Sequence, residues 1–249
     1  MGRYTPAVPR LLVINPNTTR SITELVVRHV RDALGPEFEL VPATGRFGCA
    51  YIASEACFAI GAHAVLDCLA RNVEGCDAVL LACFGDPGLF AARELSQVPV
   101  VGLAEASMHE AAESAGRFSI VTGGARWKPM LERFAAEIGR SESLASVRTV
   151  ALSGAQIAAD PDASLELLAA ECGAAAERDG AKAVILGGAG LAGLAARIQP
   201  RVRVPVLDSV LVGAQRVAAA ARKGQRTEPP AGALVPATGI DAELALKLR

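Results

Sequence analysis

One stretch of the sequence occurs twice in nearly the same form. Residues 78–88 read AVLLACFGDPG and residues 183–193 read AVILGGAGLAG, so an apolar run ends in a turn of small residues in both places. The two runs are 105 positions apart, which places Cys83 in register with Gly188. A repeat of this length indicates two similar halves. One half therefore carries a thiol at a position where the other half has no side chain.

Two further pairs of segments extend the repeat. Residues 98–100 read VPV and recur as VPV at 204–206, an offset of 106. The apolar residues 11–14 are echoed by residues 118–121, with an offset of 107. Because the three offsets nearly agree, the whole half-molecule is predicted to be duplicated.

The composition suits two ordinary globular lobes. Of 249 residues, 51% are hydrophobic and 20% are charged, so two compact lobes fit the chain better than one oversized domain. A net charge of −1 and an aromatic content of 4% offer no basic surface and few stacking platforms for nucleic acid. The N-terminus lacks the apolar stretch of a signal peptide, and no apolar run approaches the roughly 20 residues that span a bilayer. We therefore expect a cytoplasmic protein that binds neither nucleic acid nor membranes.

The spacing and context of the six cysteines predict neither disulfides nor a metal site. They are Cys49, Cys57, Cys68, Cys76, Cys83 and Cys172. A chain of this length with a large core and no export signal is expected to keep them reduced. There is no CxxC motif, and none of the three histidines has a second His or Cys at i+3 or i+4. Most of the thiols are predicted to be packing residues, and no metal is expected.

Runs of Val, Ile and Leu alternate with helix-like segments. The predicted strands are residues 11–14, 38–42, 78–82, 98–102, 118–121, 147–152, 183–186 and 204–207. The predicted helices are residues 21–34, 56–72, 88–95, 104–115, 128–138, 164–179 and 191–198, with a long helix ending near 223. Apolar runs separated by helices are typical of parallel strands covered on both faces, so both halves are predicted to be open, doubly wound α/β sheets. Residues 224–237, rich in proline and glycine, are predicted to form an extended tail before a weak terminal helix.

The repeat also predicts how the chain passes between the lobes. We expect crossings near Glu105 and near Asp208, with the last helices returning to the first lobe. The predicted first α/β lobe is residues 1–105 plus 208–249, and the predicted second lobe is residues 106–207.

The candidate site residues directly follow the apolar runs, because ligands of open α/β sheets bind beyond the carboxyl ends of the strands. They are Asn15, Cys83, Thr122 and Gly188. The three with side-chain polar groups, and nearby Asn17, have a simpler interpretation: Asn15, Asn17 and Thr122 are typical helix caps, and a free cysteine such as Cys83 is often a small buried hydrophobe. Glycine-rich turns after strands can also form a cradle of backbone N–H groups for anionic oxygen atoms. Such a cradle would favour a thiolate, so Cys83 is predicted to be the most reactive of the thiols.

Four motifs carry a family resemblance. They are VINPNTT at residues 13–19, CFGDPGL at 83–89, VTGGARWKPML at 121–131 and ILGGAGLAG at 185–193. Together they resemble the aspartate/glutamate/hydantoin racemase superfamily, and within it most closely the hydantoin and allantoin racemases. Order and spacing match from about residue 10 to residue 223, so the resemblance covers nearly the whole fold.

This resemblance implies two similar lobes related by a pseudo-twofold axis, with the active site in the cleft between them. One cysteine from each lobe would stand on opposite faces of the substrate carbon, without cofactor or metal. Cys83 takes the place of the first family cysteine. The Gly-Gly-Ala-Gly of residues 187–190 takes the place of a family Gly-Cys-Ala-Gly, which leaves Gly188 where the second thiol would be. The family also often assembles into symmetric oligomers, so a homo-oligomer is expected.

The resemblance likewise implies the contacts with a small-molecule substrate. The expected binding residues are Asn15, Phe84, Gly85, Thr122, Gly123, Gly187, Ala189 and Gly190. For three further residues near these positions, the sequence leaves more than one role open. Asp86 is a turn former or a direct participant, Glu105 orients a cleft group or caps a helix, and Trp127 is most easily interpreted as a packing anchor.

The expected chemistry is proton transfer at carbon. Inverting a stereocentre needs a base on one face and an acid on the other, and a thiol of ordinary pKa about 8.5 can be tuned to either role, whereas glycine can be neither. The preferred prediction is a cofactor-independent racemase or epimerase of a small cyclic ureide of the hydantoin or allantoin type. Cys83 would serve one face, and water or an unidentified group the other. Two alternatives are a one-thiol decarboxylase of the arylmalonate decarboxylase type and a non-catalytic binder of small carboxylates or ureides.

Overall fold

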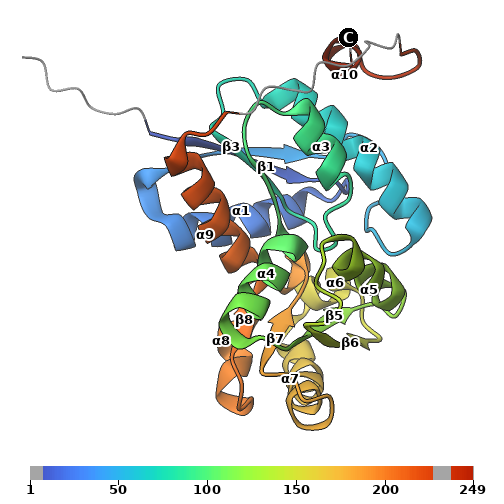
Figure 1. The fold of residues 1–249 in the computed structure, drawn as a ribbon. Coiled ribbons are helices and arrows are strands. Elements are labelled where there is room, and N and C mark those ends of the chain that lie inside the picture. The colour runs from blue at the N-terminus through green and yellow to red at the C-terminus, as the bar shows by residue number, and fades with distance from the viewer. Residues whose placement is uncertain (1–7, 227–236, 249) are drawn as a thin grey trace, which may run out of the picture.

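The computed structural model describes residues 8–226 and 237–248, which form two four-stranded parallel sheets (Figure 1). The first sheet contains β1 (Arg10–Asn15), β2 (Glu39–Thr44), β3 (Ala78–Leu81) and β4 (Val100–Gly102), in the order β2-β1-β3-β4. The second contains β5 (Phe118–Gly123), β6 (Leu144–Val150), β7 (Ala183–Leu186) and β8 (Val206–Asp208), in the order β6-β5-β7-β8. The two halves share one strand order, and the predicted α/β fold class is confirmed.

Helices flank both sheets (Figure 1). They are α1 (Arg20–Leu34), α2 (Glu55–Asn72), α3 (Leu89–Leu95), α4 (Leu103–Ala115), α5 (Trp127–Glu137), α6 (Gly154–Ala159), α7 (Pro161–Arg178), α8 (Leu194–Ile198), α9 (Ser209–Lys223) and α10 (Ala242–Lys247). Short 3-10 turns lie at Gly35–Glu37, Ala189–Leu191 and Gln199–Arg201. Elements β1 to α4 and β5 to α9 thus repeat the same alternation of strand and helix, except that two helices, α6 and α7, lie between β6 and β7.

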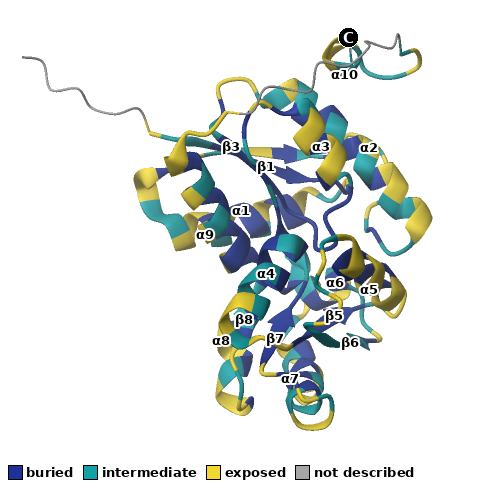
Figure 2. Ribbon diagram, in the orientation of Figure 1, coloured by how far each residue is buried: buried dark blue, intermediate teal, exposed yellow. Residues whose placement is uncertain are grey.

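The central strands of each sheet are buried along nearly their whole length (Figure 2). Their continuous apolar runs pack against helices on both faces, as expected for parallel strands. The outer strands β2 and β6 are more exposed than the central strands.

Two helices connect the halves. Helix α4 leaves the first sheet after β4 and packs against α9 and against β7 of the second sheet. Helix α9 leaves the second sheet after β8 and packs against α1 and β3 of the first. These contacts support the division into residues 1–105 plus 208–249 and residues 106–207, which stays a prediction.

Two strands begin later than predicted, at Val100 and Val206. Pro99 and Pro205 precede them, and a proline has no N–H to donate to the ladder. The carbonyl groups of both prolines still accept hydrogen bonds of 2.8 Å from the neighbouring strand. The equivalent prolines thus shorten equivalent strands in both halves.

The short helix α6 is absent from the sequence prediction. A strand over 147–152 is predicted, whereas β6 ends at Val150 and Ser153 begins α6. The Ser153 hydroxyl accepts a hydrogen bond from the backbone N–H of Gln156, and the Gln156 side chain accepts one from the N–H of Ser153, which is a capping box. This cap fixes the point where α6 starts.

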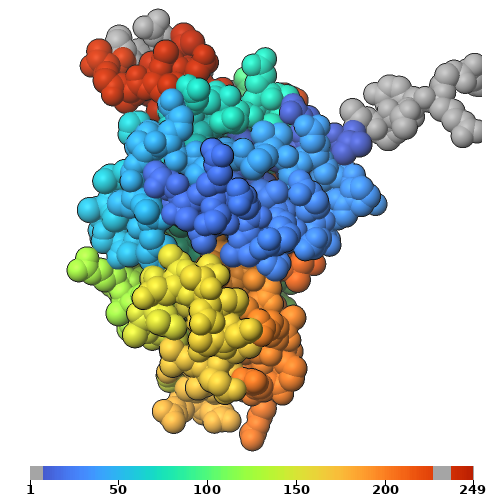
Figure 3. Space-filling view, turned by 180° about the vertical axis from the view of Figure 1, so that it is seen from behind, coloured from blue at the N-terminus to red at the C-terminus, as the bar shows by residue number. Residues whose placement is uncertain are grey.

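The C-terminal helix α10 packs against α2, and Figure 3 shows this segment lying on the first half. It follows the predicted tail, of which residues 227–236 lie outside the described residues. Within residues 8–226 and 237–248, no helix is both long and apolar enough to cross a membrane.

Candidate active site

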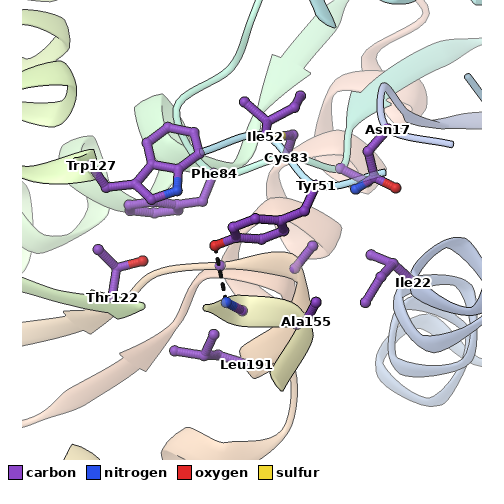
Figure 4. Close-up of a pocket in the computed structure, with 15 residues that line it drawn as sticks. Asn17, Ile22, Tyr51, Ile52, Cys83, Phe84, Thr122, Trp127, Ala155 and Leu191 are labelled. Carbon is purple, nitrogen blue, oxygen red and sulfur yellow. Dashed lines mark hydrogen bonds between the residues drawn. The ribbon is translucent and has the colours of Figure 1, made fainter. Parts of the chain in front are cut away.

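A pocket lies between the two halves, lined by residues that follow central and outer strands of both (Figure 4). The first half contributes Asn17, Ile22, Tyr51, Ile52, Ala82, Cys83 and Phe84. The second half contributes Thr122, Trp127, Gly154, Ala155, Gly188, Ala189, Gly190 and Leu191. The fold therefore brings the turns after β1, β3, β5 and β7, and the segments after β2 and β6, to one place.

Cys83 lies two residues beyond β3, at the pocket wall, and only 8% of its surface is exposed. Its carbonyl group accepts a hydrogen bond of 3.0 Å from the N–H of Asp86, which closes a tight turn. Burial raises the pKa of the Cys83 thiol far above its ordinary value, and the negative charge of Asp86 raises it further. This upward shift favours the neutral thiol and opposes the predicted thiolate, and the reactivity of Cys83 stays a prediction.

Asp86 holds the turn after β3 to the start of α4. Its carboxylate oxygens accept hydrogen bonds from the N–H groups of Ala104, at 3.0 Å, and Glu105, at 2.8 Å. Its backbone φ of 53° lies in the left-handed region. Burial raises the pKa of Asp86 to about 7, even though the two N–H donors act in the opposite direction. Asp86 is therefore a cap for α4 as well as a turn former.

Glu105 is turned away from the pocket. Its carboxylate accepts hydrogen bonds of 2.8 and 2.5 Å from the guanidinium group of Arg93. The Arg93 Nε also donates to the carbonyl of Val100 at 3.0 Å. Glu105 thus ties α4 to α3 and does not line the pocket.

Three glycines in the turn after β7 occupy positions where a side chain would be strained or would collide with neighbours. Gly188 has a φ of 143°, which L residues rarely adopt, and its N–H donates to the hydroxyl of Ser209 at 3.2 Å. A side chain at Gly187 would collide with the ring of Phe84, and one at Gly190 would collide with the backbone of Gly154. The second half therefore presents bare backbone to the pocket where the first half presents a thiol.

Tyr51 crosses the pocket from the first half to the second (Figure 4). It lies in the segment between β2 and α2, and its hydroxyl accepts a hydrogen bond of 3.0 Å from the N–H of Gly154. The same hydroxyl donates to the carbonyl of Gly123 at 3.4 Å. Burial raises the pKa of this phenol, so it stays protonated near neutral pH.

The two asparagines after β1 have different positions. Asn15 is fully buried, and its Nδ2 donates to Asn17 Oδ1, the carbonyl of Thr19 and the hydroxyl of Thr23. Its Oδ1 accepts from the N–H of Asn17. Asn15 does not line the pocket, whereas Asn17 does, and within the described chain the Nδ2 of Asn17 has no partner. Asn17 therefore has an amide group free for a ligand.

Thr122 also offers a free polar group. It lies near the end of β5 at the pocket wall, and its hydroxyl has no hydrogen-bond partner among the residues that the structure describes. Trp127, at the start of α5, is buried and lines the pocket beside it. Gly85 and Gly123 lie just behind the wall: a side chain at Gly85 would meet the Trp127 ring. The predicted binding residues thus divide into those at the wall and those that support it.

Tyr51 and Ile52 are pocket residues that were not predicted from the sequence, and Trp127 lines the pocket as well as packing. One signal was present, since Tyr51 is one of two tyrosines in the chain and lies in a segment of mostly small residues. Within the described ranges, no group of three or more His, Cys, Asp or Glu side chains is placed to hold a metal ion.

Comparison with known proteins identifies the family. Residues 11–217 match the family model described as Asp/Glu/Hydantoin racemase. The chain belongs to the Asp/Glu/hydantoin racemase family. It is 35% identical over 219 residues to a hydantoin racemase of Pseudomonas sp. (strain NS671), with 88% of each chain covered. As a member of this family the chain is an isomerase.

Solved structures of family members have the same fold. The allantoin racemase from Klebsiella pneumoniae superposes with a TM-score of 0.84 at 34% identity, over 95% of this chain and 93% of that one. The allantoin racemase from Pseudomonas fluorescens gives a TM-score of 0.85 at 32% identity, over 89% and 94% of the two chains. The resemblance carried by the four motifs is therefore confirmed along nearly the whole chain.

Proposed function

We propose that this chain is a racemase or epimerase of small cyclic ureides of the hydantoin or allantoin type, with Cys83 as an acid/base. The observation that carries the proposal is the shared pocket of Cys83 and Gly188, in a chain whose family relatives are named hydantoin and allantoin racemases. Ureides of this type have a stereogenic C–H next to a carbonyl group. Loss of that proton gives an enolate, so inversion requires proton transfer on both faces.

Cys83 serves one face of the substrate carbon. As a buried neutral thiol it donates a proton to the enolate, and by microscopic reversibility its thiolate removes the proton in the other direction. Because burial disfavours the thiolate, the thiolate formed after donation is a strong base. The reaction uses the protein's own thiol and calls on no cofactor.

The enolate oxygen is held by the turn after β7. The N–H groups of Ala189 and Gly190 begin a 3-10 turn at the pocket wall, where the first N–H groups of a turn have no partner within it. Such donors stabilise negative charge that develops during the reaction. In this proposal the free amide of Asn17 and the hydroxyl of Thr122, which both line the pocket, bind further ureide oxygen or nitrogen atoms.

The opposite face has no second thiol, because Cys83 is the one cysteine of the described chain that lines the pocket. Water adjoining Gly188 takes or gives the proton on that face in this proposal. General acid/base groups contribute typically about 10²- to 10⁴-fold, so the enzyme is expected to be slower than a two-thiol racemase by a comparable factor.

The test is loss of optical rotation from a single enantiomer of allantoin or of a 5-substituted hydantoin. The proposal predicts racemisation by the given sequence and its loss in Cys83→Ser. Cys172→Ser is the matched control, since that thiol is buried in α7 and lies outside the pocket. No racemisation by the parent, or equal rates in the parent and in Cys83→Ser, would contradict the proposal.

A second candidate follows from the single pocket thiol. A one-thiol decarboxylase of the arylmalonate type forms the same kind of enolate by losing carbon dioxide and needs a proton on one face only. Release of carbon dioxide from a disubstituted malonate, with one product enantiomer and no racemisation of ureides, would favour it over the racemase. We also propose that the chain is a cytoplasmic homo-oligomer, which sedimentation can test for the assembly.

A further inference from the structure

Two cysteines outside the active site lie side by side at the start of α2. The sulfur atoms of Cys49 and Cys57 are 2.6 Å apart, and both residues are half-buried. Cys57 occupies the first turn of α2, where Ser54 is the N-cap and its hydroxyl accepts the N–H of Cys57 at 3.3 Å. A small shift of Cys49 would bring the sulfurs to a disulfide bond length of about 2.05 Å.

Cys57 has the surroundings of a reactive thiol. The hydrogen bond from Cys49 lowers the pKa of Cys57, and contacts with Ser54 and the charge of Arg126 lower it further. A helix N-terminus also favours a thiolate. By contrast, burial raises the pKa of each of the other thiols in the cores, which are Cys68, Cys76, Cys83 and Cys172. Cys57, and not Cys83, is therefore the expected nucleophile towards oxidants and alkylating agents.

The pair brackets the segment that carries Tyr51 and Ile52 to the pocket. The segment is tied to the turn after β1, where the N–H of Thr18 donates to the carbonyl of Cys49 at 3.1 Å. From there Tyr51 reaches the N–H of Gly154 in the second half. A bond between the two sulfurs would thus close a ring around the residues that form one wall of the pocket.

We propose that Cys49 and Cys57 form a reversible disulfide with small-molecule disulfides, and that this bond clamps the Tyr51 segment over the pocket. The Cys57 thiolate attacks one sulfur of a disulfide RSSR, forming a Cys57–SR mixed disulfide and releasing one thiolate RS⁻. Cys49 then loses its proton and attacks the Cys57 sulfur, which forms the Cys49–Cys57 bond and releases the second RS⁻. The two protein thiols are oxidised, and one RSSR is reduced to two RSH.

The fluorescence of Trp127 can report whether the Tyr51 segment is clamped. Trp127 is the one tryptophan of the 249 residues, and it lines the pocket close enough to the Tyr51 hydroxyl to lower the pKa of that phenol. Closure of the ring restricts opening of the Tyr51 segment. Acrylamide therefore quenches the fluorescence of Trp127 less in the oxidised protein than in the reduced protein.

The experiment treats the full chain with oxidised glutathione and measures free thiols, intact mass and disulfide-linked peptides. The parent is expected to lose two thiols and the mass of two hydrogen atoms, with a bond between residues 49 and 57, and to recover both on reduction. Cys49→Ser is expected to stop at a stable glutathione adduct on Cys57, because no second thiol resolves it. Cys172→Ser, which removes a buried thiol, should behave as the parent does.

Three outcomes would overturn the proposal. A parent that keeps all its thiols under these conditions, or one whose disulfide joins other cysteines, would refute the pairing. A Cys49–Cys57 disulfide that leaves the quenching of Trp127 unchanged would refute the clamp. None of these readouts depends on racemase activity, so the proposal stands or falls separately from the proposed function.

Discussion

The carboxylate of Asp86 occupies the space where a side chain at position 102 would begin, which is free because residue 102 is Gly102. In the second half the equivalent position carries Asp208, whose carboxylate accepts hydrogen bonds from the N–H groups of Val210 and Leu211 in the first turn of α9, at 2.9 and 3.2 Å. Both lobes thus place a carboxylate at the start of the helix that connects them. The first half supplies it from the turn that also carries Cys83, which couples that turn to α4.

Gly102→Ala is predicted to displace the Asp86 carboxylate and to leave the N–H groups of Ala104 and Glu105 without acceptors. A lost partner for a buried polar group costs about 1–3 kcal/mol, so the free energy of unfolding should fall by at least that much. Urea denaturation measures it. The control is Gly173→Ala in α7, where an added methyl group has open space and should raise stability by up to about 1 kcal/mol. Equal stability of Gly102→Ala and the parent would contradict this account.

The pH dependence of stability should carry a contribution from Asp86. Its folded pKa is raised to about 7, above an unfolded value of about 3.9, so between these values the folded chain binds more protons. The stabilisation is full below about pH 4 and is lost as the pH rises through about 7. We expect the difference in unfolding free energy between the parent and Asp86→Asn to shrink over this range. A difference that grows with pH would show that folding lowers the pKa of Asp86 instead of raising it.

Substitutions of the two asparagines after β1 should have different effects, one on the stability of the fold and the other on ligand binding. Asn15→Ala removes a buried amide with four hydrogen-bond contacts and should lower the free energy of unfolding by about 1–3 kcal/mol. Asn17→Asp keeps the oxygen that accepts from the N–H of Thr19 but replaces the free amide, so it should raise KM with little loss of stability. Thermal unfolding and steady-state kinetics distinguish the two, and the reverse pattern would refute the assignment of Asn17 to the ligand.

Local sequence patterns predict the fold well here because each half alternates apolar strands with helices, and the repeat fixes equivalent turns. The pattern cannot show that the Asn15 amide is already hydrogen-bonded to Asn17 and Thr23, or that the Tyr51 side chain reaches the other half. Those features depend on side chains meeting across long sequence separations. The upward shift of the Cys83 pKa likewise follows from burial, which only the packed structure shows.

Gly188→Cys tests whether a second thiol at position 188 can transfer a proton to the substrate. The structure predicts that this substitution also strains the backbone. The φ of 143° at Gly188 is strained for any L residue, and a Cβ there would lie 3.0 Å from a methyl group of Leu191. Such strain costs about 1–3 kcal/mol. Gly188→Ala shares the strain without an acid/base group, so Gly188→Cys should racemise a ureide about 10²- to 10⁴-fold faster than Gly188→Ala. Equal rates in the two variants would mean that position 188 does not face the substrate carbon.

The most direct measurement is solvent-deuterium exchange at the stereocentre of one allantoin or hydantoin enantiomer in D₂O. The account predicts that the parent incorporates deuterium together with inversion, and that Cys83→Ser lowers both by about 10²- to 10⁴-fold while Cys172→Ser lowers neither. Exchange and inversion at parental rates in Cys83→Ser would contradict the central role of the Cys83 thiol.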